Sequence, residues 1–173
     1  KTAAALVAEV ALAEGKYSQG FPEYGPERMG APIRGFTRIA ERPIRVHSAV
    51  YHPDAVIVLD DSLLETVDVA ENLSEDGVVV VNTARPPEEI AKRLSARGKG
   101  VFLVEASRIA LDEIGRDIPN TPMIGALVKA TGVVDLETVL HDTEKKLSKK
   151  FGERIVQGNL KAVRRGYEEV KQA

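Results

Sequence analysis

Three short, apolar and mostly β-branched runs recur along the middle of the chain, and each is followed by a helix-like segment. The runs are DAVIVLD (54–60), GVVVVNT (77–83) and GVFLVEA (100–106). The segments that follow them are DSLLETV (61–67), PPEEIAKRLSARG (86–98) and SRIALDEIG (107–115). Strands that are apolar throughout are buried on both faces, as in a parallel sheet covered by helices. The pattern therefore predicts an α/β fold: a three-layer, Rossmann-like domain with a largely parallel sheet.

The segments before these runs predict a buried first helix and an added hairpin. Residues 1–14 are rich in alanine and leucine, which favour helices, and Gly15 suits the position after the helix end. KYSQGF (16–21) has the character of a short strand, and PIRGFTRI (32–39) alternates with the period of a strand. We expect RPIRVHS (42–48) to continue this second strand or to pair with it as an antiparallel hairpin.

The last third of the chain predicts a helical C-terminal tail. One helix is expected to be capped by Asn120 or Thr121 and to stop at Gly132, and Asp135 is expected to cap the next. The final helix carries a narrow apolar stripe made of Val156, Leu160, Val163, Tyr167 and Val170. We expect this stripe to dock on the domain's own sheet; the alternative is contact with a partner subunit. No internal linker appears, so we expect one domain over residues 1–173.

Charge and cysteine content exclude several classes of protein. The 24 basic and 26 acidic side chains leave a net charge of −2, which gives no electrostatic footprint for nucleic acid or an anionic membrane surface. The chain has no cysteine, so it supplies neither disulfides nor thiolate ligands for an iron–sulfur cluster. No apolar run approaches the ~20 residues of a membrane helix. No secretory signal is visible, and we expect a cytoplasmic protein. Because Lys1 already lies in an expected helix, we also expect residues upstream of it to be missing.

Polar residues follow the predicted strands, where an open parallel sheet binds its ligands. These residues are Asp60-Asp61, Asn82-Thr83 and Glu105 to Ser107. Asp60 and Asn82 are the candidate binding residues, since an acid at a strand end can hold a ribose hydroxyl. However, no G-x-G-x-x-G motif precedes Asp60, so support for a dinucleotide site is weak. We expect Asp61 and Ser107 to act as helix caps.

The sequence offers no set of residues with the spacing of a catalytic or metal site. His47, His52 and His141 do not lie at metal-ligand spacing from one another. No G-x-S-x-G elbow and no P-loop are present, and no nucleophile is accompanied by a base and an orienting group. The acid–lysine cluster HDTEKKLSKK (141–150) is typical of a solvated helix face. We therefore predict no catalytic residue and no metal ligand in this chain.

FPEYGPERMGAPIR (21–34) is an unusual loop between the first two predicted strands. Its prolines fix the backbone and lower the entropy lost on ordering, while its glycines permit turns and close approach. Tyrosine and arginine are common among the residues that dominate binding energy in interfaces. The residues alone leave two interpretations open, a structural loop or a contact with a partner or ligand. The candidate interface residues are Pro22, Glu23, Tyr24, Gly25, Pro26, Glu27, Arg28, Gly30, Ala31, Pro32 and Arg34.

SQGFPEYGPERMGAP (18–32) closely resembles the hallmark loop of the gamma subunits of 2-oxoacid:ferredoxin oxidoreductases, and most of all the pyruvate branch. The alanine-rich first helix, FTRI (36–39), DAVIVLD and GVVVVNT agree with this family. The match is good over roughly the first 110 residues. Positions 22, 24, 25, 27 and 30 fit the broad gamma pattern, and positions 23, 26, 28, 31 and 32 fit the pyruvate type. Two features depart from it: Met29 stands where many relatives have arginine, and the family's glycine-rich segment (G-x-G-G-Q-G) is absent before Lys1.

The resemblance implies the function of a larger enzyme. Such enzymes convert pyruvate, coenzyme A and oxidised ferredoxin into acetyl-CoA, carbon dioxide and reduced ferredoxin. Thiamine diphosphate with Mg²⁺ is held by the alpha and beta subunits, and 4Fe-4S clusters by the delta and beta subunits. The gamma subunit is an α/β domain without a cofactor, so the isolated chain is expected to be inactive. Residues 21–34 would then meet the thiamine-binding subunits near the entrance for coenzyme A or substrate.

Two alternatives remain at this stage. The chain can instead be the equivalent subunit of an oxidoreductase acting on indolepyruvate, 2-oxoglutarate or 2-oxoisovalerate, because substrate choice lies mainly in other subunits. From another class, it can be a free-standing nucleotide-binding or regulatory α/β module that uses Asp60 and the strand ends.

Overall fold

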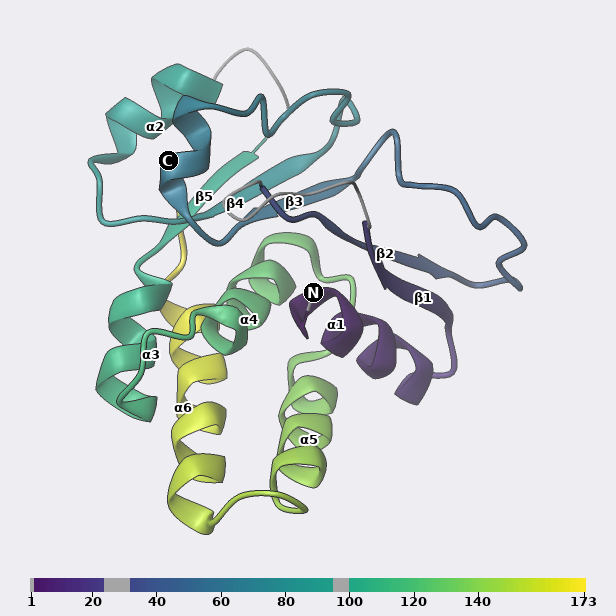
Figure 1. Ribbon diagram of the computed structural model, residues 1–173, viewed down its shortest axis with the longest axis vertical. Coiled ribbons are helices and arrows are strands. Elements are labelled where there is room, and N and C mark those ends of the chain that lie inside the picture. The colour runs from purple at the N-terminus through teal and green to yellow at the C-terminus, as the bar shows by residue number, and fades with distance from the viewer. Residues whose placement is uncertain (1, 24–31, 95–99) are drawn as a thin grey trace.

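The computed structural model describes residues 2–23, 32–94 and 100–173. Its main sheet has the order β3-β4-β5-β6. Strands β3 (Ala55–Val58), β4 (Val78–Asn82) and β5 (Gly100–Val104) run parallel, and each lies within one of the three predicted apolar runs. Strand β6 (Lys171–Gln172) is antiparallel to β5 and was not predicted. Figure 1 shows the parallel strands side by side in the upper half of the molecule.

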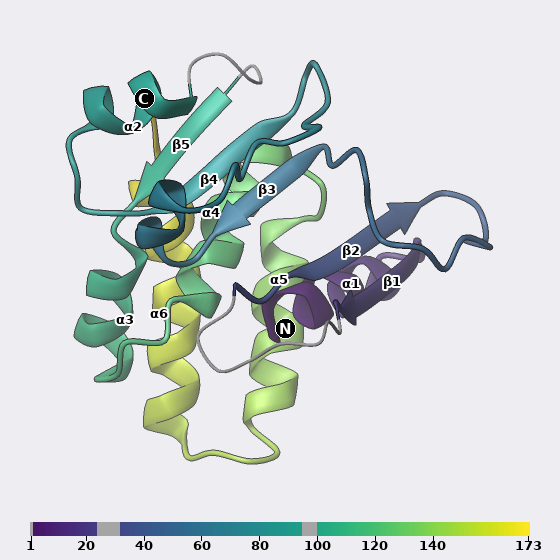
Figure 2. The same ribbon diagram turned by 45° about the horizontal axis from the view of Figure 1, so that its top comes forward.

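Both faces of this sheet are covered. On one face, Val79 and Val81 of β4 pack with α2 (Pro87–Leu94) and the 3₁₀ helix η1 (Asp61–Glu65). On the other face, Val80 packs with α3 (Ala106–Ile114), α4 (Asn120–Thr131) and α6 (Glu153–Glu169). These three valines have no exposed surface, so β4 alternates between two layers of core as a central strand does. The three-layer α/β fold with a largely parallel sheet is confirmed (Figure 2).

The C-terminal helices form one of the layers and are more than a tail. Helix α4 runs between the sheet and α6, and its backbone approaches that of α6 closely because both helices carry glycine at the contact. A Cβ on Gly166 would lie 1.9 Å from the carbonyl oxygen of Pro122, and one on Gly125 would lie 2.0 Å from that of Val163. The two helices therefore meet at a separation that no side chain would allow.

The apolar stripe of the last helix packs within the domain, but mainly against other helices and not on the sheet as predicted. Val156 and Val163 are buried, and Leu160 and Tyr167 pack against a cluster shared by α1 (Thr2–Ala13), α4 and α5 (Leu136–Leu147). Lys129 of α4 also lies over the ring of Tyr167, 4.9 Å from its centroid. The alternative role of this stripe as a subunit contact is thus not needed to explain it.

The hairpin forms between different partners from those predicted. Strand β1 (Tyr17–Pro22) pairs antiparallel with β2 (Gly35–Ala40), so the second strand of the hairpin was predicted correctly. Residues 42–48, by contrast, have no regular secondary structure, and their prediction as a strand is wrong. Strand β2 pairs with β1 along one edge, and among the described residues no backbone hydrogen bond joins 42–48 to its other edge or to another segment.

Helix boundaries follow the capping predictions in part. Asp135 caps α5 by accepting hydrogen bonds from the N–H groups of Glu137 and Thr138. Gly15, Gly115 and Gly132 end their helices with positive φ. The N-cap of α4 is Pro119, so neither Asn120 nor Thr121 caps it. The Thr121 hydroxyl instead donates to Asn159 Oδ1 on α6 at 2.9 Å, so it joins the two helices.

Candidate functional site: a hairpin loop beside the strand ends

The β1–β2 hairpin closes the base of the unusual loop. Pro22 lies opposite Gly35 at the end of the ladder, and the N–H of Glu23 donates to the carbonyl of Arg34 at 3.0 Å. The carboxylate of Glu23 also lies 3.9 Å from Arg34 Nε. Both side chains are about half exposed, at 42% and 55%, so this ion pair adds little. The backbone pairing is what brings the two ends of the loop together.

Helix α1 packs against one face of the β1–β2 hairpin. Ser18 of β1 and Thr37 of β2 donate their hydroxyls to the carbonyls of Ala8 and Ala4 on α1. Gly20 lies so close to this helix that a Cβ would stand 2.9 Å from the carbonyl oxygen of Ala4. The alanine-rich face of α1 thus has a purpose beyond helix propensity, because small side chains let the hairpin approach.

Aromatic contacts fix the hairpin near the loop. Phe21 and Phe36 face each other across the strands with ring centroids 5.6 Å apart. The guanidinium of Arg38 lies 5.8 Å from the centroid of Phe21, within the range of a cation–π contact. These contacts lie within two ladder positions of the loop, so they hold its base in one orientation.

The structure covers only part of the predicted interface loop. Pro22, Glu23, Pro32 and Arg34 lie at its base, and they are partly or largely exposed. The other predicted residues fall outside the described part of the chain: Tyr24, Gly25, Pro26, Glu27, Arg28, Gly30 and Ala31. Strand β2 runs opposite to β3, so the segment entering β2 lies on the side of the molecule toward which the parallel strands point (Figure 2).

Asn82 ties the strand ends together. Its Nδ2 group donates to the carbonyl of Leu59 after β3 and to the Ser107 hydroxyl in α3, each at 2.9 Å. Its Oδ1 atom accepts from the Ser107 N–H at 3.0 Å. The amide therefore has internal partners on both of its polar atoms and is only 8% exposed. The residue predicted as a ligand-binding candidate fills a structural position here, and its binding role stays a prediction.

The predicted cap at Asp61 is wrong, because Asp60 holds that position instead; the predicted binding role of Asp60 stays a prediction. Asp60 is the N-cap of η1 and accepts from the Ser62 N–H at 3.0 Å. Hydrogen bonds from the Ser62 side chain and backbone hold the pKa of Asp60 below its ordinary value. Asp61 lies inside the first turn and accepts from the Thr83 hydroxyl at 2.5 Å, so it is not the cap. Ser107 is not a cap either, because Glu105 holds the N-cap position of α3.

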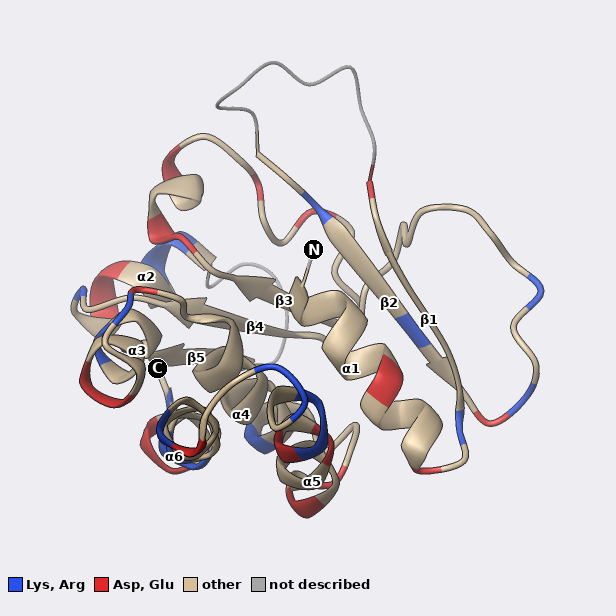
Figure 3. Ribbon diagram, turned by 60° about the horizontal axis from the view of Figure 1, so that its bottom comes forward, with Lys and Arg blue, Asp and Glu red and all other residues tan. Residues whose placement is uncertain are grey.

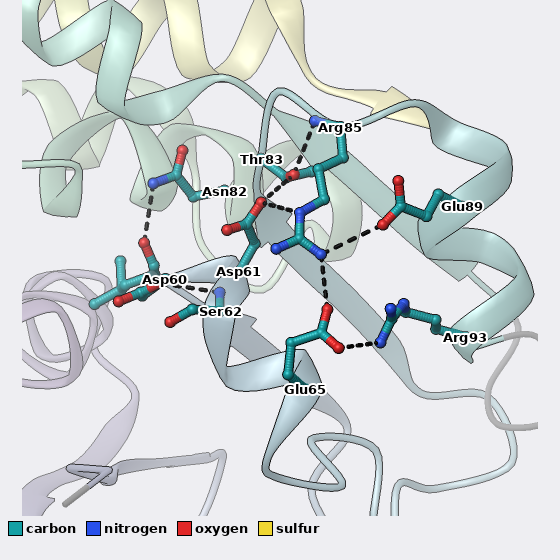
Figure 4. Close-up of polar contacts among 10 residues, drawn as sticks. Asp60, Asp61, Ser62, Glu65, Asn82, Thr83, Arg85, Glu89 and Arg93 are labelled. Atoms are coloured by element: carbon teal, nitrogen blue, oxygen red, sulfur yellow. Dashed lines mark hydrogen bonds and ion pairs between the residues drawn. The ribbon is translucent and has the colours of Figure 1, made fainter.

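An ion-pair network that sequence reasoning missed extends from these strand ends to α2. Arg85 Nε lies 3.2 Å from Asp61, and its Nη1 lies 2.9 Å from Glu65. Glu65 also pairs with Arg93 at 2.8 Å (Figure 4). Hydrogen bonds from Arg85 and then Arg93 lower the pKa of Glu65. The only sequence signal was the spacing of Arg85 and Glu89, four residues apart, which the structure joins at 3.4 Å.

The donor atoms available in this site do not suggest metal chemistry. Among the described residues, no three His, Asp or Glu side chains gather closely enough to hold a metal ion. Within the same part of the chain, no helix combines the length and apolar character needed to cross a lipid bilayer. The site consists of a loop base closed by the β1–β2 hairpin and of strand ends whose polar groups mostly hydrogen-bond or pair with one another.

Comparison with known proteins identifies the family. The family model described as pyruvate ferredoxin/flavodoxin oxidoreductase matches residues 1–169. The chain belongs to this family. It is 52% identical to pyruvate synthase subunit PorC of Thermotoga maritima over 171 residues, which cover 99% of this chain and 88% of that one. The family predicted from the loop sequence is therefore confirmed.

Further members of the pyruvate ferredoxin/flavodoxin oxidoreductase family agree in sequence and in fold. The chain is 48% identical to the pyruvate/ketoisovalerate oxidoreductases common subunit gamma of Pyrococcus abyssi, covering 98% of this chain and 90% of the relative. The crystal structure of pyruvate oxidoreductase subunit PORC from Thermotoga maritima superposes with a TM-score of 0.86 at 46% identity, covering 100% of this chain and 90% of that one. A gamma subunit from Geobacter sulfurreducens gives 0.67 at 25% identity, covering 97% and 89%.

Proposed function

We propose that this chain is the gamma subunit of a multisubunit pyruvate:ferredoxin oxidoreductase. The observation that carries the proposal is similarity along nearly the whole chain to a pyruvate synthase subunit, at 52% identity. The reaction would be the conversion of pyruvate, coenzyme A and oxidised ferredoxin into acetyl-CoA, carbon dioxide and reduced ferredoxin. In this complex the chain would have a structural role, with the alpha, beta and delta subunits as its partners.

The cofactors would be held by those partners. Thiamine diphosphate with Mg²⁺ would supply the decarboxylation chemistry, and 4Fe-4S clusters would carry electrons to ferredoxin. This chain has no cysteine with which to ligate a cluster. Among the described residues, the carboxylates at the strand ends are engaged with Ser62, Thr83 and Arg85. The residues present therefore fit a subunit of the complex whose cofactors are bound by the other subunits.

The loop of residues 21–34 would be the contact with the thiamine-binding subunits, near the entrance for coenzyme A or substrate. Its support is the clamped base: the Glu23–Arg34 backbone hydrogen bond and the β1–β2 ladder fix both ends. A loop whose ends are fixed loses less entropy on binding than a free one. Arg28→Glu should lower co-elution of the complex or its turnover, whereas Arg116→Glu, on an exposed turn beyond α3, should not.

A second candidate function differs only in the oxoacid. The Pyrococcus abyssi relative is described as a subunit common to pyruvate and ketoisovalerate oxidoreductases, so in that organism one gamma subunit serves two substrates. A gamma subunit shared in this way does not itself select the oxoacid. The test is to reconstitute the complex with this chain and measure turnover of pyruvate, 2-oxoisovalerate, 2-oxoglutarate and indolepyruvate. A complex that turned over another of these oxoacids but not pyruvate would reject the pyruvate assignment.

The function of another class, a free-standing nucleotide-binding module, has less support. Asn82 is occupied by Leu59 and Ser107, and the Asp60 carboxylate caps η1. Isothermal titration with coenzyme A, ATP and NAD tests it directly. Micromolar binding of ATP or NAD, lost in Asp60→Asn, would favour the module over the subunit, whereas binding of coenzyme A alone would not, because coenzyme A is a substrate of the proposed complex.

A further inference from the structure

Residues 41–52 form an exposed arm between β2 and β3, and the arm points away from the body of the molecule (Figure 2). We propose that its strand-like part, residues 42–48, adds as an extra strand to an exposed sheet edge of a partner subunit, next to acidic side chains. This inference rests on the proposed function, because it assigns a second contact to the same complex.

The sequence of the arm is that of a strand, although the structure gives it no strand partner. In RPIRVHS, Ile44 and Val46 alternate with Arg45 and His47, which is the period of a half-buried strand. Pro43 stands near the start of the segment, where an edge strand tolerates proline. A strand pattern with a missing partner is what a segment that pairs with another chain would show.

The backbone of the arm is unpaired within the described part of the chain. None of residues 41–52 takes part in a backbone–backbone hydrogen bond there. Near its return the arm is held by Arg38, whose Nη2 group donates to the carbonyl of Ala49 at 2.8 Å and to the Ser48 hydroxyl at 3.5 Å. Irregular connections of this length within compact domains are uncommon and often functional. Among the described residues, the N–H and C=O groups of residues 42–48 therefore have no backbone partner, and the segment joins β2 to β3 as an irregular connection.

Apolar side chains on the arm are exposed to a degree that folding of this domain does not explain. Tyr51 is 67% exposed and Val46 is 54% exposed. Tyrosine and arginine are the residue types most enriched in the energetic centres of interfaces, and Tyr51 lies on the same arm as Arg42 and Arg45. Burial of these side chains requires a surface from outside the domain.

Charge selects the kind of partner. The segment 41–48 has two arginines and one glutamate, so its formal charge is positive, and Figure 3 shows basic positions along the protruding arm. An acidic edge strand of the partner complements this charge. In the added strand, Ile44 and Val46 would lie on one face of the partner's sheet, and Arg45 and His47 on the other. A second copy of this chain fits less well, because antiparallel self-pairing centred on the segment would place Arg45 opposite Arg45. Like charges directly opposite each other destabilise such a pair.

Proline substitution tests strand addition, since alternate N–H groups of an added strand face the partner. The complex would be assembled with two double variants, Ile44→Pro/Val46→Pro and Arg45→Pro/His47→Pro, each with a double alanine variant as its matched control. We expect one proline pair to weaken retention of this chain by about tenfold beyond its alanine control, and the other to match its control. Retention is measured by native mass spectrometry over a salt series, and the melting temperature of each isolated variant checks its folding.

Three outcomes decide the matter. Strand addition is supported if one proline pair weakens retention in the complex and the other pair, shifted by one residue, does not. Equal retention for both proline pairs, or an isolated chain whose dimerisation is lost in the proline variants, overturns it. If the unchanged chain itself fails to join the complex, the proposed function fails, and that result is distinct from a failure of the arm alone.

Discussion

Asn82 and Ser107 join β4 to α3 through two hydrogen bonds that run in opposite directions. The Asn82 amide donates to the Ser107 hydroxyl at 2.9 Å, and the Ser107 N–H donates back to the Asn82 oxygen at 3.0 Å. The same amide reaches the carbonyl of Leu59 after β3. One side chain thus fixes the relative positions of β4, α3 and the segment after β3 at the carboxyl ends of the parallel strands.

Asn82→Asp should destabilise the domain by about 2 kcal/mol. The substitution keeps the oxygen that accepts from Ser107, but it removes the N–H₂ group and leaves the carbonyl of Leu59 without its partner. Urea unfolding monitored by circular dichroism measures the change. The matched control is Asn72→Asp in an exposed turn, which should stay within about 0.5 kcal/mol. Equal effects of the two substitutions would show that the Asn82 hydrogen bonds carry no stability.

Gly166→Ala should strongly destabilise the helical layer. Its Cβ would lie 1.9 Å from the carbonyl oxygen of Pro122, so α6 must move away from α4. Overpacking of this kind costs about 1–3 kcal/mol and often more when backbone has to move. Gly152→Ala is the control, because nothing lies within 4 Å of a Cβ there. The two melting temperatures measure the contrast, and a Gly166→Ala variant as stable as Gly152→Ala would contradict the close contact.

The network around Glu65 predicts a loss of stability in acid. Its pKa is lowered in the folded chain by Arg85 and Arg93, so its contribution is present above its unfolded pKa of about 4.3 and is lost as the pH falls through the folded value. The stability difference between the unchanged chain and Glu65→Gln should be constant from about pH 7 to about pH 5 and shrink below about pH 4. Thermal melts over this range measure it. A difference that persists unchanged at about pH 3 would rule out the ion pairs as its source.

The parallel sheet could be predicted because its signal is strong and local. Each apolar run carries its own evidence of burial on both faces, and Val79, Val80 and Val81 are indeed without exposed surface. The segment 42–48 has an equally regular pattern, but alternation reports only that a segment suits a strand. Whether such a segment pairs with a neighbouring strand is a property of the folded chain: β1 pairs with one edge of β2, and residues 42–48 do not pair with the other.

Other features escaped sequence reasoning because they arise from distant contacts. Strand β6 is only two residues long, too short to produce a period. The cap at Asp60 and the roles of Asp61 and Thr83 depend on where three strands end relative to one another. In contrast, the family was recognisable from the proline- and glycine-rich string of residues 18–32 alone, although most of that loop lies outside the described residues.

Native mass spectrometry of the purified assembly tests the central proposal most directly. Expressed at native level and isolated through an affinity tag, this chain should appear in one complex with a thiamine-binding subunit and an iron–sulfur subunit, at a fixed stoichiometry. Arg28→Glu should lower the share of the chain found in that complex, whereas Arg116→Glu should leave it unchanged. A chain that runs alone under gentle conditions, with no thiamine-binding partner, would contradict the assignment as a gamma subunit.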